Sequence, residues 1–226
     1  MKSYKKVPAQ LLFMITAAEM KALEEQAVQN GTSVQELMEN AGKAVYEIVK
    51  EKYGLDGHQV VIFAGQGNNG GDGLVAARYF AEEVSVVILF FGDFEKLSEE
   101  AEQNYNKIKE TVPILEIRNK EDFENIHLQK SLNYIFIDAL LGTGVKGKIR
   151  ETFSFGIDLF NSGKAIKVAV DLPSGMDPDT GEVEDKACEA DLIVCFHDLK
   201  QGLEKFKDKT VIVDIGLDPE VKIGKA

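Results

Sequence analysis

The sequence has no tryptophan and contains only two cysteines, three histidines and five prolines among its 226 residues. Cys188 and Cys195 lie seven positions apart, and this spacing matches neither a Cys-x-x-Cys pair nor a set of zinc ligands. We therefore expect them to be reduced packing residues of a cytosolic protein. The histidines are scattered and form no ligand pair, so we expect surface residues rather than catalysts at His58, His127 and His197.

Long apolar runs and basic clusters are also missing. The longest apolar run, 84–91, has eight residues and includes Ser85, whereas a membrane-spanning helix needs about 20. Acidic residues number 38 against 26 lysines and arginines, which gives a formal net charge of −12 that would repel a phosphate backbone. The most basic stretch, 2–6, is short. These deficits argue against membranes and nucleic acid as partners.

The residues that are present suit one folded domain. Hydrophobic residues make up 44% of the chain and include 13 phenylalanines, which is ample for a core. At roughly 150 residues per domain, the length fits one large domain or two small ones. No repeat, low-complexity tract or linker divides the chain. We therefore expect a single domain over residues 1–226, with N-terminal helices at 16–53 and an α/β sheet at 58–216.

Two capping boxes predict the N-terminal helices. Lysines within 2–6, followed by the apolar run 11–18, resemble the charged and apolar regions of a signal peptide. The motif Thr16-Ala-Ala-Glu19 favours a different interpretation, in which this run leads into a helix. A second box, Ser33-Val-Gln-Glu36, opens a helix with one apolar face, and Gly54 ends it.

Beyond residue 54, short apolar runs alternate with polar stretches of helix length. Most runs are nearly continuous Val, Ile, Leu and Phe, which indicates strands buried on both faces. We predict an α/β fold, a doubly wound and mainly parallel sheet with helices on both faces, as in a Rossmann-like three-layer sandwich. The predicted strands are 60–64, 84–91, 114–117, 134–137, 168–170, 192–196 and 211–213; the predicted crossover helices are 71–83, 98–111, 121–130 and 152–162.

Polar residues and glycines follow three of these strands, at the sheet edge where α/β proteins bind ligands. The first strand is followed by Gly65-Gln-Gly-Asn-Asn-Gly-Gly-Asp-Gly73, which fits the dinucleotide pattern Gly-x-Gly-x-x-Gly. Two alternatives stay open, a ligand-free turn and a dinucleotide site. In a dinucleotide site, an acidic residue about 20 positions further on should bind the ribose. The nearest candidate here is Asp93, which lies 28 positions after Gly65. A P-loop is excluded because its Gly-Lys-Ser/Thr ending is missing.

The other two strand ends carry carboxylates. Asp138 could simply cap the structure after its strand. Asp171 precedes Leu-Pro-Ser-Gly, where Pro173 and Gly175 favour a tight turn that would hold the carboxylate rigidly. Such a group could serve as a general acid or base. Oxygen donors from Asn69, Asp138 and Ser174 could also hold a cation, and this mostly neutral set suits potassium better than a divalent metal.

Together these motifs resemble the NAD(P)H-hydrate epimerase family. The similarity covers nearly the whole chain and runs through Met14-Ile-Thr-Ala-Ala-Glu-Met20, Leu37-Met-Glu-Asn-Ala-Gly42, Gly67-Asn-Asn-Gly-Gly-Asp-Gly73, Asp138-Ala-Leu-Leu-Gly142, Val170-Asp-Leu-Pro-Ser-Gly175 and Val213-Asp-Ile-Gly216. The resemblance implies an isomerase that interconverts the R and S forms of NADH and NADPH hydrated at C6 of the nicotinamide ring. A separate or fused dehydratase, specific for the S form, would then restore the cofactor.

The resemblance also implies roles for individual residues. Asp171 corresponds to a substrate-contacting and catalytic carboxylate, and Asn69, Asp138 and Ser174 correspond to ligands of one potassium ion per subunit. The implied substrate-binding residues, besides Asp171, are Asn68, Asn69, Gly70, Gly71, Asp72, Gly142, Thr143, Gly144, Val145, Lys146, Gly147 and Lys148. A homodimer in the cytoplasm is implied as well, with contacts through the N-terminal helices.

Several points stay open at this stage. The segment 196–203 keeps a lysine and a glycine expected of the family, but His197 and Asp198 replace smaller or hydroxylated residues. The chain could be a stand-alone epimerase or one half of a fused protein. Epimerisation could proceed by loss and return of water or by ring opening. Two other classes remain as alternatives, an NAD-dependent oxidoreductase and a non-catalytic interaction or RNA-processing module on the same fold.

Overall fold

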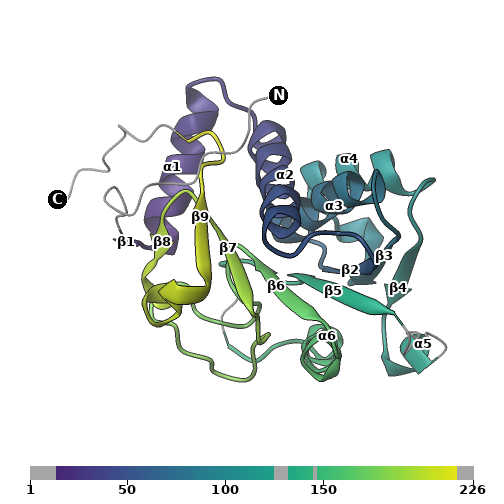
Figure 1. Ribbon diagram of the computed structural model, residues 1–226. Helices are drawn as coiled ribbons and strands as arrows, with labels where there is room; N and C mark the ends of the chain where they lie inside the picture. Colours follow the sequence, from purple (N-terminus) through teal and green to yellow (C-terminus); the bar gives the residue numbers. More distant parts are fainter. Residues whose placement is uncertain (1–13, 125–131, 145–146, 218–226) are drawn as a thin grey trace.

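The computed structural model describes residues 14–124, 132–144 and 147–217 (Figure 1). Seven parallel strands form the central sheet in the order β4-β3-β2-β5-β6-β7-β9. Their bounds are β2 His58–Ala64, β3 Val86–Phe91, β4 Ile114–Ile117, β5 Asn133–Ala139, β6 Ile166–Val170, β7 Leu192–Phe196 and β9 Thr210–Val213. The chain runs outward from β2 to one edge and then returns through β5 to the other, so the predicted doubly wound fold is confirmed.

Helices cover both faces of the sheet (Figure 1). One side carries α1 Ala17–Gln29, α2 Val34–Tyr53, α3 Asn68–Ala81 and α4 Glu99–Ile108, and the other side carries α6 Glu151–Ser162. The smaller elements are β1 Met14–Ile15, α5 Lys120–Glu124, β8 Leu199–Lys200 and the 3₁₀ helices η2 Phe94–Lys96 and η3 Gln201–Lys209. Strand β1 pairs in parallel with β8 as a separate two-stranded sheet. Among the described residues, no helix combines the length and the apolar character that a membrane span requires.

The first predicted capping box forms completely, and the second is shown by one of its two hydrogen bonds. The Thr16 hydroxyl accepts a hydrogen bond from the Glu19 amide at 3.1 Å, and the Thr16 amide donates to the Glu19 carboxylate at 2.8 Å. The Ser33 hydroxyl likewise accepts from the Glu36 amide at 3.1 Å. Gly54 ends α2 with φ +69°, a conformation that glycine adopts without strain. Residues 1–13, which carry the charged part of the signal-like segment, lie outside the described residues.

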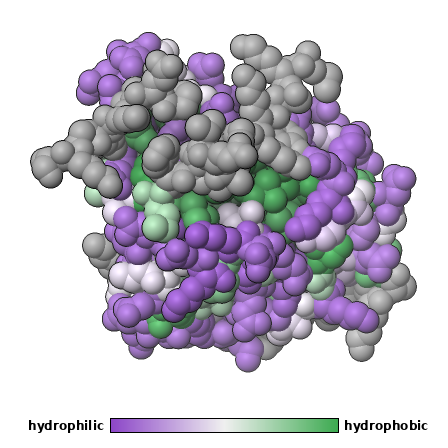
Figure 2. Space-filling model, turned by 60° about the vertical axis from the view of Figure 1, so that its left-hand side comes forward, coloured by the Kyte–Doolittle hydropathy of each residue, from purple (hydrophilic) through white to green (hydrophobic). Residues whose placement is uncertain are grey.

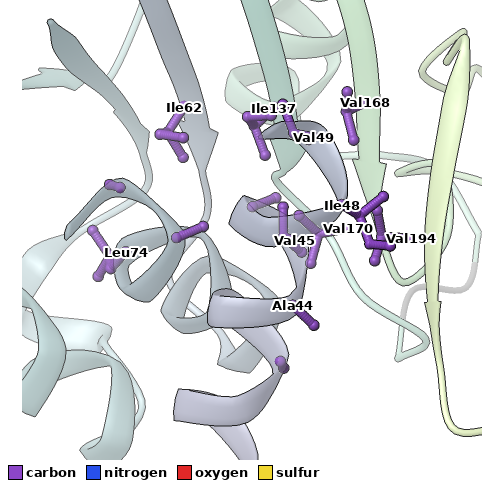
Figure 3. Packing of buried hydrophobic residues seen from close by; sticks show 14 of the residues in the cluster. Ala44, Val45, Ile48, Val49, Ile62, Leu74, Ile137, Val168, Val170 and Val194 are labelled. Atoms are coloured by element: carbon purple, nitrogen blue, oxygen red, sulfur yellow. The ribbon is translucent and has the colours of Figure 1, made fainter. Parts of the chain in front are cut away.

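Each strand in the middle of the sheet is buried on both faces, as its continuous apolar run predicts. Side chains of α2, such as Val45 and Val49, lie near Ile137 and Val170 on one face (Figure 3). On the other face, Phe63 packs against three phenylalanine rings at centroid distances of 5.1–5.9 Å, namely Phe91, Phe136 and Phe160. Phenylalanine rings therefore provide the large aromatic groups of this core, in a chain that has no tryptophan. Hydrophilic residues dominate the surface around a smaller hydrophobic patch (Figure 2).

Two local expectations differ from the structure, and a third is met. The glycine-rich run was expected as a turn ahead of a helix at 71–83, but α3 begins at Asn68, so most of the run is helical. His197 was expected at the surface and is instead buried, with 8% of its area exposed. Cys188 and Cys195 are free and buried, which agrees with a packing role.

Close packing of helices explains why α3 starts early. A Cβ on Gly42 of α2 would lie 2.5 Å from the Asp72 carbonyl oxygen, and one on Gly71 would lie 2.6 Å from the Met38 side chain. A Cβ on Gly73 would lie 2.6 Å from the Ala139 side chain of β5. Glycine therefore lets the first turns of α3 pass close to α2 and to the sheet. The packing at these contacts stabilises the helix from Asn68 onward and outweighs the low helix propensity of the glycines.

We expect Gly42→Ala to lower the free energy of unfolding by about 1–3 kcal/mol, because the added methyl group overpacks the contact between α2 and α3. Urea denaturation at neutral pH measures the change. Gly144→Ala is the matched control, since a Cβ there meets no atom within 4 Å. Equal unfolding midpoints for the two variants would contradict this account of the packing.

Candidate active site

A cleft of about 480 Å³ lies at the carboxyl ends of the central strands. Because β2, β5, β6 and β7 are neighbours in one parallel sheet, the residues that follow them meet at this edge. The described residues that line it include Glu24, Gln66, Gly67, Asn68, Asn69, Gly70, Asp72, Leu141, Gly142, Thr143, Gly144, Arg150, Asp171 and Phe196. Most of the residues that the sequence pointed to are therefore brought together.

Several predicted residues do not line this cleft. Gly71 faces Met38 and Ala101 in the helix packing. Asp138 and Ser174 are buried beneath the cleft rather than on its wall. Gly147 and Lys148 are absent from the described residues that form the wall. Val145 and Lys146 lie outside the described residues.

Asp171 is held at the end of β6 by contacts with the chain that follows β7. Its φ of +64° is unusual for a residue other than glycine, and such strain persists only where the surroundings fix the backbone. The Asp171 carboxylate accepts a hydrogen bond from the Phe196 amide at 3.0 Å and forms an ion pair with the Lys200 ammonium. Only 9% of the Asp171 area is exposed. The carboxylate is therefore fixed in direction at the cleft.

Lys200, on the short strand β8, has no exposed area. Its ammonium also donates to the Phe196 carbonyl at 2.9 Å. Burial acts to lower the pKa of Lys200, but the attraction of Asp171, together with smaller contributions, outweighs it and the pKa is raised. The lysine stays charged and neutralises Asp171. In the sequence this lysine stands in the segment 196–203, where no motif indicates its ion pair with Asp171.

Two further carboxyl groups stand near this pair. Asp72 in α3 is half-buried, and its pKa lies well above its usual range, chiefly because the surrounding chain shields it from water and then because Asp171 and Glu24 repel its charge. Glu24 in α1 is exposed at the rim of the cleft, and partial loss of solvent there, with the Asp171 charge as the next cause, also raises its pKa. Glu24 was not singled out from the sequence, since one glutamate on a polar helix looks like any solvated residue. The site thus holds three carboxyl groups for one buried lysine, which favours protonation of at least one of them.

The predicted cation ligands also lie close together. The Asp138 carboxylate accepts hydrogen bonds from the Ser174 amide at 2.8 Å, the Ser174 hydroxyl at 2.5 Å and the Leu140 amide at 3.2 Å. The Leu141 carbonyl accepts from the Asn69 side chain at 3.0 Å and from the Ser174 hydroxyl at 3.2 Å. These groups belong to Asp138 in β5, to the residues that follow β5 and β6, and to Asn69 in the first turn of α3. Asp138 is fully buried, and burial raises its pKa.

The donor set fits a monovalent cation. A fully buried carboxylate normally needs a positive partner, yet Asp138 forms no ion pair with any residue that the structure describes. The oxygens that meet here come from the Asp138 carboxylate, the Ser174 hydroxyl and the Leu141 carbonyl, and the Asn69 amide group is bonded to that carbonyl, which suits a weakly hydrated ion. Asp138, Ser174, Asn69 and the Leu141 carbonyl are the groups that could hold it.

Comparison with known proteins identifies the family of this chain. The profile of the family described as YjeF-related protein N-terminus matches residues 34–202. The NAD(P)H-hydrate epimerase of Nitrosopumilus maritimus is 37% identical over 93% of this chain and 98% of its own length. The chain is a member of the NAD(P)H-hydrate epimerase family. The corresponding enzyme of Cenarchaeum symbiosum is 38% identical over the same shares of both chains.

Two other similarities concern a longer relative and the fold. The Bifunctional NAD(P)H-hydrate repair enzyme Nnr of Pyrobaculum aerophilum is 38% identical over 92% of this chain and 43% of its own length. The crystal structure of the yeast protein ynu0 has the same fold, with a TM-score of 0.79 at 23% identity over 95% of this chain and 98% of that one. None of these similarities favours the oxidoreductase or the non-catalytic alternative.

We expect Lys200→Met to lower the free energy of unfolding by about 3–5 kcal/mol, because it leaves the Asp171 carboxylate buried without its counter-charge. Urea denaturation measures the loss, and the double variant with Asp171→Asn should recover part of it. Lys207→Met is the control, since its pair with Glu204 is exposed and should contribute less than about 1 kcal/mol. A Lys200→Met protein as stable as the wild type would contradict this role.

Proposed function

We propose that this protein interconverts the R and S epimers of hydrated NADH and NADPH at C6 of the nicotinamide ring. Family membership supports the activity, and the epimerases that carry this name match along 98% of their own lengths. The observation that carries the site is the Asp171 carboxylate, fixed by Phe196 and Lys200 at the cleft.

The chemistry requires a proton to move on and off the C6 oxygen. If water is lost, a carboxyl group protonates the departing hydroxyl, the ring nitrogen stabilises the resulting cation, and water returns to the opposite face while its proton goes back to the carboxylate. If the ring opens, a carboxylate takes the hydroxyl proton, the C6 carbonyl forms as the bond from C6 to the ring nitrogen breaks, and the nitrogen keeps the electron pair; on closure the nitrogen attacks the other face of the carbonyl and the carboxyl group returns the proton to the oxygen. Asp171 is the proposed acid and base. Asp72, whose pKa is raised, is suited to hold a proton in the same cluster.

The remaining expected residues complete the proposed site. Asn68, Asn69, Gly70 and Asp72, with Gly142, Thr143 and Gly144, lie on the cleft wall where the substrate would bind. The N-terminus of α3 at Gly67, which the helix dipole makes positive, suits the substrate's pyrophosphate. This local feature explains how a chain with a net charge of −12 could bind an anionic substrate.

The wider setting of the enzyme is also a proposal. We propose a single domain and a cytoplasmic homodimer that makes contact through the N-terminal helices. Its product would feed a dehydratase. The Bifunctional NAD(P)H-hydrate repair enzymes, of which the chain spans less than half, support a link between the two activities.

We expect Asp171→Asn to lower kcat for epimerisation by about 10²–10⁴-fold, since the amide can neither give nor accept the proton. NMR or chromatography of purified R-hydrate of NADH measures formation of the S form. Asp208→Asn, the same change at an exposed position in η3, is the control and should retain wild-type turnover. Near wild-type turnover in Asp171→Asn would refute the catalytic role.

One potassium ion per subunit is proposed at Asn69, Asp138 and Ser174, with the Leu141 carbonyl. When bound, the ion would supply the positive charge that the buried Asp138 carboxylate lacks. These residues also connect the ends of β5 and β6 to the start of α3. The chain's own part in this arrangement is to fix the loop after Asp138, which carries Gly142 and Thr143 along the cleft.

A pH dependence follows from Asp138. Because burial raises its pKa in the folded chain above the ordinary value of 3.8, the stability from this group is fully present below about pH 4 and is lost as the pH rises through the raised pKa. A bound potassium ion should cancel this loss. We therefore expect potassium chloride, compared with tetramethylammonium chloride at equal ionic strength, to raise Tm at neutral pH and to have little effect near pH 4.

Differential scanning calorimetry measures this effect. At a free ion concentration of about a hundred times Kd, the stabilisation would be about 2.7 kcal/mol. The neutral variant Asp138→Asn should lose the potassium effect at every pH. A potassium effect of equal size in the wild type and in Asp138→Asn would place the ion elsewhere.

A further inference from the structure

Asp93 is a conspicuous acidic residue that the proposed reaction does not use. It lies directly beyond β3, which pairs with β2 in parallel, so it stands at the same sheet edge as the cleft. Dinucleotide-binding sheets place an acidic residue after the second strand of the nucleotide-binding unit, where it accepts hydrogen bonds from the ribose of the adenosine. Asp93 occupies that position, although its spacing of 28 residues from Gly65 is longer than usual.

A second cleft, of about 460 Å³, lies beside Asp93 at the ends of β3 and β4. It shares Gln66, Arg150 and Phe153 with the active-site cleft, so the two clefts adjoin each other. The Asp93 amide donates a hydrogen bond to the Gln66 side chain at 3.2 Å, which joins the end of β3 to the turn after β2. A long ligand could therefore extend from Asp171, past the start of α3, to Asp93.

The middle of this path suits phosphate groups. Gly67 begins α3 without a side-chain cap, and a Cβ there would meet no atom within 4 Å, so the first amides of the helix are open to a ligand. Arg150 stacks over the Phe153 ring at 4.9 Å where the two clefts join. Within the described parts of the chain Arg150 forms no ion pair, so its charge is available to an anion.

The far end suits a ribose rather than another phosphate. The Asp93 carboxylate accepts a hydrogen bond from the Glu95 amide at 3.0 Å and pairs with Lys96 at 2.9 Å. The neighbourhood of Lys96 keeps the pKa of Asp93 below its usual value, so it is ionised at neutral pH. The cleft has as many acidic as basic side chains, with Glu95 and Glu116 beside Asp93 and with Arg118 and Arg150 beside Lys96. It therefore offers no excess positive charge for a 2′-phosphate.

We propose that the cleft at the ends of β3 and β4 binds the adenosine half of the substrate, and that the Asp93 carboxylate accepts hydrogen bonds from its ribose hydroxyls. This inference rests on the proposed function, because it takes the nicotinamide end of the same molecule to lie at Asp171. It assigns the enzyme a preference for NADH-hydrate over NADPH-hydrate, since a 2′-phosphate would meet the Asp93 charge.

Truncated and complete substrates test the subsite. In the wild type, kcat/KM for NADH-hydrate should exceed that for hydrated reduced nicotinamide mononucleotide, which lacks the adenosine, by about tenfold or more. Asp93→Asn should raise KM for NADH-hydrate about tenfold, change NADPH-hydrate less, and leave the mononucleotide unchanged. Asp56→Asn is the matched control, because it removes the same charge from an exposed position before β2, at the opposite edge of the sheet.

Binding of ADP, measured by calorimetry, gives a readout that does not depend on turnover. ADP should bind the wild type and Asp56→Asn equally, and Asp93→Asn at least about fivefold more weakly. Equal KM values for NADH-hydrate in the wild type and in Asp93→Asn, with unchanged ADP binding, would overturn the subsite even if epimerisation is confirmed. If no hydrate is epimerised but ADP binding still depends on Asp93, the proposed reaction fails and the nucleotide subsite stands.

Discussion

The buried ion pair between Asp171 and Lys200 is the interaction on which the arrangement of the cleft depends. A lysine without exposed area is stable only with a counter-charge, and Asp171 provides it. The same pair connects the end of β6 to β8 and, through the Phe196 amide and carbonyl, to the end of β7. Two residues with positive φ, Asp171 and His197, lie at these strand ends, and the pair helps to keep both in place.

The surrounding architecture makes this local arrangement rigid. Because the parallel strands are buried on both faces, the position of each strand end is fixed by the core. Helix α3 passes close to α2 and to β5 because glycines stand at the contacts. The helix start at Asn68, the Asp138 carboxylate and the Asp171 carboxylate are therefore placed by the core rather than by flexible loops. Electrostatically, the site relies on helix amides and one buried lysine, and the acidic total charge of the molecule says little about it.

Much of the fold and the position of the site could be predicted from the sequence, because the patterns that indicate them lie within short segments. Continuous apolar runs identified all seven strands of the main sheet, and the capping boxes at Thr16 and Ser33 identified the starts of two helices. The residues after β2, β5 and β6 were correctly expected at one edge, since parallel topology requires it. Their individual roles in binding and catalysis remain predictions.

What the sequence did not reveal depends on contacts between distant segments. Lys200 and Glu24 reach the site from β8 and α1, and neither lies in a motif that distinguishes it from a solvated charge. The helix start at Asn68 is set by the approach of α2, which outweighs the low helix propensity of glycine. His197 is buried because its backbone turns at φ +65° and its amide bonds to the Val213 carbonyl of β9 at 2.7 Å, a partner 16 residues away.

The short pairing of β1 with β8 has a consequence for how the protein is made. Met14 and Ile15 pair with Leu199 and Lys200, and α1, which follows β1, carries Glu24 to the cleft. The ribosome releases residues 14–29 early and Lys200 only after most of the chain has emerged. Until then, Asp171 has no buried lysine to meet and the first strand has no partner. The cleft is therefore one of the last parts to take shape during synthesis, and a nascent chain that stops short of β8 would have strands and helices but no assembled centre.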